Sequence, residues 1–231
     1  MDSNLDQLIS KTLDQKMTTQ EWVTDTIRMG ILNNYFKDGE SIPTAGLAEK
    51  LGVSRMPIRI ALLQLESEGL VSLKPHKPAV AVTLSPEEVL QIYDMRFELE
   101  GLSVQLATKE ATEKEMKELY AIVIEMEKTT DSKVFMKLNN NFHNMINELS
   151  NNEILINLIT QLRNKVLKYV KLYLSEDMNL KKANKYHKQI INAMIDRDPN
   201  KAQQAVHEHL ANTCTTVAEN LRNSANDKVN I

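Results

Sequence analysis

The sequence is poor in cysteine, glycine and proline, and it lacks a long apolar run. Its single cysteine, Cys214, cannot form an internal disulfide, so a disulfide-held scaffold is excluded and a reducing compartment is expected. Six glycines and six prolines in 231 residues favour helices over a chain of hairpins. No stretch of about 18 apolar residues occurs, and the polar N-terminus resembles no secretory signal. We therefore expect a cytoplasmic protein without membrane partners.

An excess of positive charge is also missing, since 28 lysines and arginines stand against 31 aspartates and glutamates. The formal net charge of −3 excludes a generally basic, nucleic-acid-coating protein, so any contact with DNA must come from a local cluster. The length and the hydrophobic content of 42% suffice for two domains, each with its own core.

One strand pair is predicted, in LVSLKPHKPAVAV (residues 70–82), where Val80 and Val82 alternate with smaller residues after a proline-punctuated loop. A capping box follows, with Ser85 and Glu88 on either side of a first-turn proline. A long helix should begin there. We expect an extension over residues 1–18, a first domain over 19–83, a second over 84–222 and a tail over 223–231.

Three helices are predicted before the strand pair. Apolar residues recur with helical spacing over residues 19–36 and 44–51, and Gly52 ends the second segment. The third helix buries one face with i, i+3, i+4, i+7 spacing: Ile58, Ala61, Leu62 and Leu65. The order helix, helix, glycine turn, helix and two-stranded wing indicates a winged helix-turn-helix domain.

Two arginines begin the third helix. Arg55 and Arg59 are four residues apart, off the buried face, where free backbone N–H groups also point outward. Pro57 fits this first turn because it lacks an N–H and has a helical φ. A helix N-terminus ordinarily attracts acidic side chains, so arginines here indicate an anionic partner such as DNA. A solvated arginine pair is the alternative, and the wing residues His76 and Lys77 favour DNA.

Residues 85–222 predict six helices in an antiparallel bundle. Three histidines fall on apolar stripes, His143, His187 and His209, whereas His207 should point to solvent. A hydrogen-bonded core histidine is the ordinary interpretation of each one. Three converging imidazoles would lack partners, however, unless they shared a metal or an anion.

The segment LAEKLGVSRMPIRIALLQLESEGLVSLKPHKPAV (residues 47–80) resembles the DNA-binding domain of the GntR family of bacterial regulators. This resemblance implies that Arg55 and Arg59 read or clamp operator DNA, with Ser54 and Met56 beside them. It also implies that the wing loop, with His76 and Lys77, reaches the minor groove. The sequence departs from the family pattern at four positions that affect base preference: Ala45, Met56, Ile60 and Pro78.

The segments YDMRFELEGLSVQLA, FH and YHKQIINAMIDRDPNKAQQAVHEHL resemble the FCD effector domain of the FadR branch, and six helices suggest its VanR-like subgroup. The resemblance implies a divalent metal held by His143, His187 and His209. The family's aspartate ligand falls on Asn139, a weaker, neutral donor. Such a set could still bind zinc or nickel and leave positions open for a carboxylate effector.

Two arginines are candidate effector ligands. Arg96 matches a family arginine and either pairs with Glu100 four residues on or faces the ligand. Arg163 borders an apolar stripe and either faces the ligand or is solvated.

The predicted function is a transcription regulator, without catalysis, that binds a pseudo-palindromic operator in double-stranded DNA as a homodimer and responds to a small organic acid. One alternative is a metal-dependent, hydrolase-like enzyme with a DNA-binding module. It would need a general base near the metal, and no Asp or Glu stands beside His143 or His187 in the sequence. The other alternative is a pure metal sensor.

Overall fold

The computed structural model describes residues 17–33, 35–37, 39–174 and 177–229, so most of the expected N-terminal extension lies outside the described residues. The chain forms two compact units, Met1–Thr83 and Leu84–Ile231, which are described separately. The mostly helical fold class, with a winged helix-turn-helix and a six-helix bundle, is confirmed. No helix in the described part of the chain combines the length and the apolar content needed to span a bilayer.

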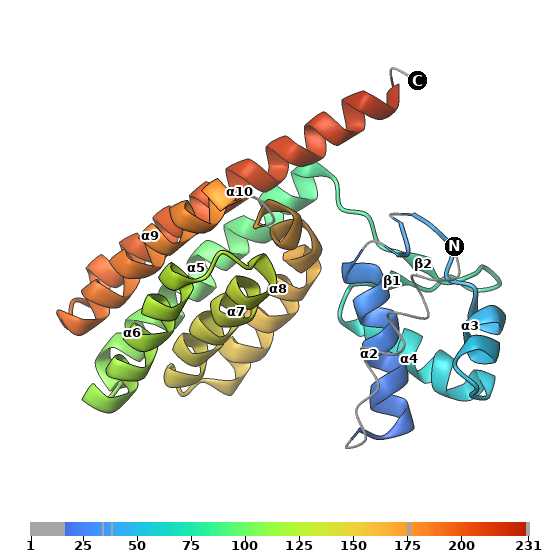
Figure 1. Cartoon of the computed structure of the whole chain (residues 1–231), viewed down its shortest axis with the longest axis horizontal. Coiled ribbons are helices and arrows are strands. Elements are labelled where there is room, and N and C mark those ends of the chain that lie inside the picture. The colour runs from blue at the N-terminus through green and yellow to red at the C-terminus, as the bar shows by residue number, and fades with distance from the viewer. Residues whose placement is uncertain (1–16, 34, 38, 175–176, 230–231) are drawn as a thin grey trace. The chain divides into compact units, whose positions relative to one another are not determined.

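The first unit contains α2 (Thr19–Leu32), α3 (Thr44–Lys50), α4 (Arg55–Ser67), β1 (Val71–Ser72) and β2 (Val80–Ala81) (Figure 1). Its core joins one face of each helix to the inner side of the wing, because all five elements contribute buried apolar residues. The predicted inner face of α4 is confirmed, since its four members are each less than 5% exposed: Ile58, Ala61, Leu62 and Leu65.

Helix α2 is shorter than predicted. It begins with a capping box between Thr18 and Glu21 and ends at Leu32, not at Phe36. Asn33 leaves the helical conformation, with φ −95° and ψ 11°, yet the Phe36 ring beyond it is buried in the core. A buried aromatic residue in the following loop thus continued the apolar period of the helix by coincidence.

The inner face of β2 is formed by Ala81 and not by Val80 and Val82, the valines on which the strand prediction is based. Val71 pairs with Ala81 across the two antiparallel strands, and directly opposed residues share a face of the sheet. Because Val71 is buried, Ala81 is buried with it, while Val80 and Val82 are half-buried. The loop before α3 adds to β2 from the other side, where the Ile42 backbone N–H donates to the Ala79 carbonyl at 2.8 Å.

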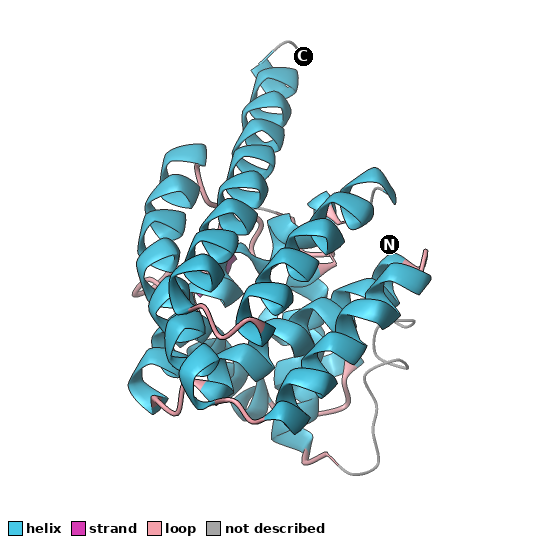
Figure 2. Cartoon of the chain, turned by 90° about the vertical axis from the view of Figure 1, so that its left-hand side faces the viewer, coloured by secondary structure: helices cyan, strands magenta, loops and turns pink. Residues whose placement is uncertain are grey.

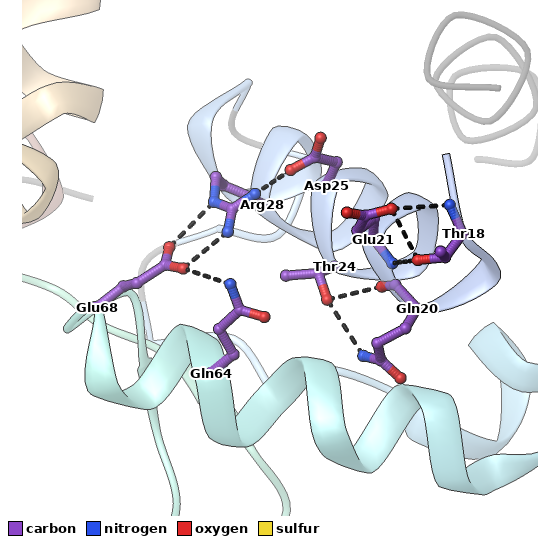
Figure 3. Close-up of polar contacts among 8 residues, drawn as sticks. All are labelled: Thr18, Gln20, Glu21, Thr24, Asp25, Arg28, Gln64 and Glu68. Carbon is purple, nitrogen blue, oxygen red and sulfur yellow. Dashed lines mark hydrogen bonds and ion pairs between the residues drawn. The ribbon is translucent and has the colours of Figure 1, made fainter. Parts of the chain in front are cut away.

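A polar bridge ties α2 to the C-terminal end of α4 (Figure 3). The Arg28 guanidinium donates to both carboxylate oxygens of Glu68, at 3.0 and 2.7 Å, and also pairs with Asp25. Gln64 donates to Glu68 from the preceding turn of α4, at 3.2 Å. Bidentate geometry of this kind is the strong form of an arginine–carboxylate contact.

The second unit is a bundle of six helices. The expected capping box is present, because Ser85 accepts from the Glu88 backbone N–H and the Glu88 carboxylate accepts from the Ser85 backbone N–H. The last helix lies along the first and beside the fifth (Figures 1 and 2), and it carries the buried Cys214. The helices are α5 (Pro86–Glu110), α6 (Glu113–Lys128), α7 (Ser132–Leu149), α8 (Glu153–Tyr173), α9 (Asp177–Ile195) and α10 (Pro199–Val229).

Replacing Glu68 by Ala should lower the free energy of unfolding of the first unit by about 1 kcal/mol, since the bridge is only partly shielded from solvent. Trp22, the only tryptophan of the sequence, lies on α2, so its fluorescence during urea unfolding reports on this unit. Arg28→Ala should cost about as much, and the double variant should cost less than the sum of the two single changes. Additive losses would show that the two side chains do not interact in solution.

Candidate functional site

Three histidines from three helices meet inside the bundle. His143 projects from α7, His187 from α9 and His209 from α10, and one ring nitrogen of each lies within 4.8 Å of the other two. The ring centroids are 5.3 Å apart for His143 and His187, 5.1 Å for His143 and His209, and 4.7 Å for His187 and His209. Asn139, one turn before His143, is buried and lines the same cavity as His143 and His209.

The ring nitrogens of this cluster are short of hydrogen-bond partners. Among the described residues, neither nitrogen of His187 forms a hydrogen bond, and the same holds for Nδ1 of His209. His187 is fully buried, so its unsatisfied nitrogens carry a desolvation cost. Convergent, unpaired imidazole nitrogens are the donor set that zinc and nickel prefer, and the residues present therefore fit a divalent metal.

All three imidazoles are neutral in the folded chain. Burial, followed by the charge of Arg163, holds the pKa of His143 well below its usual range. Burial, followed by the neighbouring His209, does the same to the pKa of His187. Burial, with Arg96, lowers the pKa of His209 to about 3. Neutral imidazole is the form that binds a metal, so no proton has to be removed first.

A buried carboxylate adjoins the histidines, which sequence analysis did not foresee. Glu100 on α5 accepts from Arg96 at 2.7 Å, and its second oxygen lies 3.6 Å from the Arg163 guanidinium and 4.0 Å from Nδ1 of His143. No acidic residue stands beside His143 in the sequence, yet the fold brings Glu100 to it from another helix. The signal was the i, i+4 spacing of Arg96 and Glu100, which puts both side chains on one face.

The two effector candidates line the cavity together. Arg96 pairs with Glu100, as the first alternative predicts, and it also borders the cavity, while its guanidinium lies 4.5 Å from the centre of the Tyr93 ring. The side chain of Arg163 is 13% exposed, so the solvated alternative is wrong. The cavity is about 40 Å³, and an outer cleft of about 210 Å³ between α7 and α8 shares Asn140 and Arg163 with it.

His207 is not fully solvated, contrary to the sequence prediction. It is half-buried between α5 and α10, and one ring nitrogen lies 2.9 Å from the Phe97 carbonyl. Gly101 makes room for this ring, since a Cβ at that position would lie 2.6 Å from Nε2 of His207. His207 thus connects two helices and is absent from the histidine cluster.

The DNA-binding candidates form a separate group on the first unit. Arg55, Arg59, Ser54 and Met56 are all exposed at the beginning of α4. The Ser54 side chain makes no capping hydrogen bond, and the first turn of α4 holds no acidic residue. The N–H groups of this turn therefore remain available to an anion.

The wing tip is a tight turn that presents His76. The Lys77 backbone N–H donates to the Lys74 carbonyl at 3.1 Å, and Pro75 and His76 stand between them. His76 has a φ of 60°, a left-handed conformation that is uncommon outside glycine. Both His76 and Lys77 are exposed.

Comparison with known proteins identifies the family. The model for bacterial regulatory proteins of the gntR family matches residues 19–80, and the FCD domain model matches residues 91–212. The chain belongs to the GntR family. It is similar to the HTH-type transcriptional regulator YdhC of Bacillus subtilis (strain 168), with 31% identity over 188 residues, 80% of this chain and 84% of YdhC.

Two solved structures share the fold of this GntR regulator. Escherichia coli McbR/YncC has a TM-score of 0.76 and 22% identity, covering 88% of this chain and 99% of the other. A metal-free FCD domain has a TM-score of 0.51 and 20% identity, covering 61% and 99%. GntR proteins are transcription regulators, so the expectation that the chain is not an enzyme is confirmed and the hydrolase alternative is wrong. FCD domains can bind metals.

The stability of the metal-free protein should fall as the pH drops below 6.5. The unfolded chain protonates its histidines near that pH, whereas the folded chain keeps these three neutral. The unfolded state then binds more protons, and each histidine costs about 1.4 kcal/mol per pH unit until its folded pKa is reached.

Urea unfolding with a chelator at about pH 7, 6 and 5 measures this slope. His209→Leu should remove about a third of the histidine contribution, because one of the three groups no longer titrates. An unchanged slope in that variant would show that His209 is already protonated in the folded chain.

Proposed function

We propose that this GntR regulator binds a small organic acid together with a divalent metal, zinc or nickel, inside its FCD bundle, and that it acts in the cytoplasm. One observation carries the proposal. Three neutral imidazoles converge inside the bundle. Two of them, those of His143 and His209, line one cavity together with two guanidinium groups that share one buried carboxylate. The imidazoles could donate to a metal, and the guanidinium groups could pair with an anion.

The charges of the cavity favour an anionic effector. Arg96 and Arg163 bring two positive charges, and Glu100 brings one negative charge, so one positive charge remains before any metal binds. A divalent ion on the three histidines would add two more positive charges. Because an uncompensated buried charge is costly, the loaded site should hold a carboxylate, with Arg163 as its partner from α8.

Because residue 139 is an asparagine and not an aspartate, the proposed metal ligands of this chain supply no negative charge, and a bound anion has to supply it. The Asn139 side chain lies on α7 one turn before His143 and borders the cavity, so its amide oxygen could complete the donor set. Unlike a carboxylate, an amide brings no negative charge. The neutralising charge then has to come from the effector, and metal and acid should strengthen each other's binding.

The effector can reach the cavity from the outer cleft. The two spaces share residues of α7 and α8, and the amides of Asn140, Asn144 and Asn164 line the outer one. The inner cavity of about 40 Å³ admits a metal with water or a carboxylate group, not a bulky molecule. We therefore propose an acid whose carboxylate enters the inner cavity while its remainder lies in the cleft.

Operator binding rests on α4 and the wing. Arg55 and Arg59 offer exposed guanidinium groups beside free N–H groups, and the wing offers His76 and Lys77. One such head makes few base contacts, so we propose a homodimer that binds two half-sites of a pseudo-palindromic operator. The acid would then act by changing the spacing of the two heads.

A pure metal sensor is the second candidate, supported by the unpaired nitrogens of His187. The buried arginines argue for the acid, because a metal alone would add positive charge beside them.

Replacing His187 or His209 by Ala should abolish stoichiometric binding of zinc and nickel, since each removes one of three converging donors. Metal analysis of the purified protein and calorimetric titration with each ion measure this loss. His207→Ala is the matched control and should keep full occupancy, because its ring contacts Phe97 and not the cluster. Full occupancy in both cluster variants would place the metal elsewhere.

Asn139→Asp tests the role of the anion at the same site. The added carboxylate should raise metal affinity about tenfold or more. It should also weaken the binding of acetate, a carboxylate probe that chelates free metal only weakly, by reducing the positive charge of the site. A metal sensor without an acid would show the first effect, and added acetate would leave its metal affinity unchanged.

Replacing Arg55 or Arg59 by Ala should weaken specific DNA binding by about 1 to 3 kcal/mol without unfolding the unit, because both side chains are exposed. Gel-shift titration against a duplex selected by the wild-type protein measures this loss. Lys77→Ala should weaken binding with less effect on sequence preference. Light scattering should show a dimer, and a monomer that binds one half-site as tightly as two would contradict the operator model.

A further inference from the structure

Helix α4 carries an apolar stripe on its outer side. Met56, Ile60 and Leu63 are 59%, 45% and 51% exposed, respectively. At 3.6 residues per turn they lie on one side of the helix, directly opposite its buried face. Three large apolar side chains in a row on one exposed helix face are a contiguous patch, which commonly marks a binding surface.

The surroundings of the stripe indicate which partner covers it. Arg55 and Arg59 are exposed along one side of the stripe, and the helix begins with free N–H groups and no acidic residue. In the same unit, the wing exposes His76 and Lys77. A surface that is apolar in the middle and positive at its border fits a polyanion with apolar groups in its interior.

Double-stranded DNA offers such groups in its major groove. Each base pair presents hydrogen-bonding atoms there, and thymine adds a C5-methyl group, the apolar feature of the groove. From Met56 to Leu63 the helix rises about 10 Å, which corresponds to about three base-pair steps. The stripe can thus contact several thymines while the arginines bind phosphate or guanine.

We propose that Met56, Ile60 and Leu63 select thymine by packing against its methyl groups in the major groove. The inference rests on the proposed operator function, in which α4 enters the groove. It assigns the preference for thymine to the three apolar residues and leaves the contacts with phosphate or guanine to Arg55 and Arg59.

The test replaces thymine by uracil, which keeps every hydrogen bond and lacks only the methyl group. The full-length protein first selects its preferred duplex from a random DNA pool. That duplex is then prepared with uracil at one thymine position at a time, and affinities are compared by titration at fixed salt concentration.

We expect uracil to weaken wild-type binding about fourfold at each contacted thymine, the equivalent of one buried methyl group. In Met56→Ala and in Ile60→Ala, the difference should disappear at the thymine that the replaced side chain contacts. The variant should then bind the thymine duplex and the uracil duplex with equal affinity at that position. Two controls should keep the difference: Met29→Ala, an exposed methionine on α2, and Arg55→Ala, which weakens both duplexes equally.

Three outcomes would contradict the inference. Equal affinity of the wild type for thymine and uracil duplexes would overturn it while the operator function stands. Alanine variants that keep the thymine preference but change the oligomeric state in light scattering would assign the stripe to contact between copies of the chain. A wild-type protein that selects no sequence would overturn the operator function itself, and the inference with it.

Discussion

The contact between Glu100 and the two guanidinium groups of Arg96 and Arg163 is the interaction on which the bundle interior depends. Burial of two arginines would be prohibitive without a carboxylate between them. With Glu100 in place, the positive charges stay inside, where they add to burial, the larger cause, in lowering the pKa of His209 and of His143. Burial and the two guanidinium groups together therefore keep the imidazoles in the neutral form that can donate to a metal.

The histidine cluster could be found in the sequence because helical periodicity places side chains reliably. His143, His187 and His209 each recur with apolar neighbours at intervals of three and four residues, and three inward stripes in one bundle meet in its centre. The capping box at Ser85 was equally local, since its hydrogen bonds join residues three apart. Features of this kind depend on residues a few positions apart within one helix. Tertiary contacts do not alter them, so they can be predicted from the sequence.

Features set by tertiary contacts could not be predicted in the same way. Helix α2 ends before Phe36 although the apolar period continues, and the inner face of β2 follows from its pairing partner. Helical spacing places Glu100 beside Arg96 but cannot place it beside His143, which is on another helix. Sequence analysis misplaced His207 because a half-buried position between two helices depends on how closely they approach, which no periodicity reveals.

That close approach has a mechanical consequence. At Gly101 the surfaces of α5 and α10 leave no clearance, because even a single added carbon would collide with the His207 ring. Close-packed surfaces cannot slide over one another without first separating. Helix α5 holds Arg96 and Glu100, and α10 holds His209, so the two helices that approach here also carry residues at the cavity and its buried carboxylate. The two longest helices of the bundle thus meet at Gly101, and any change in their spacing there would also change the spacing of Arg96 and His209.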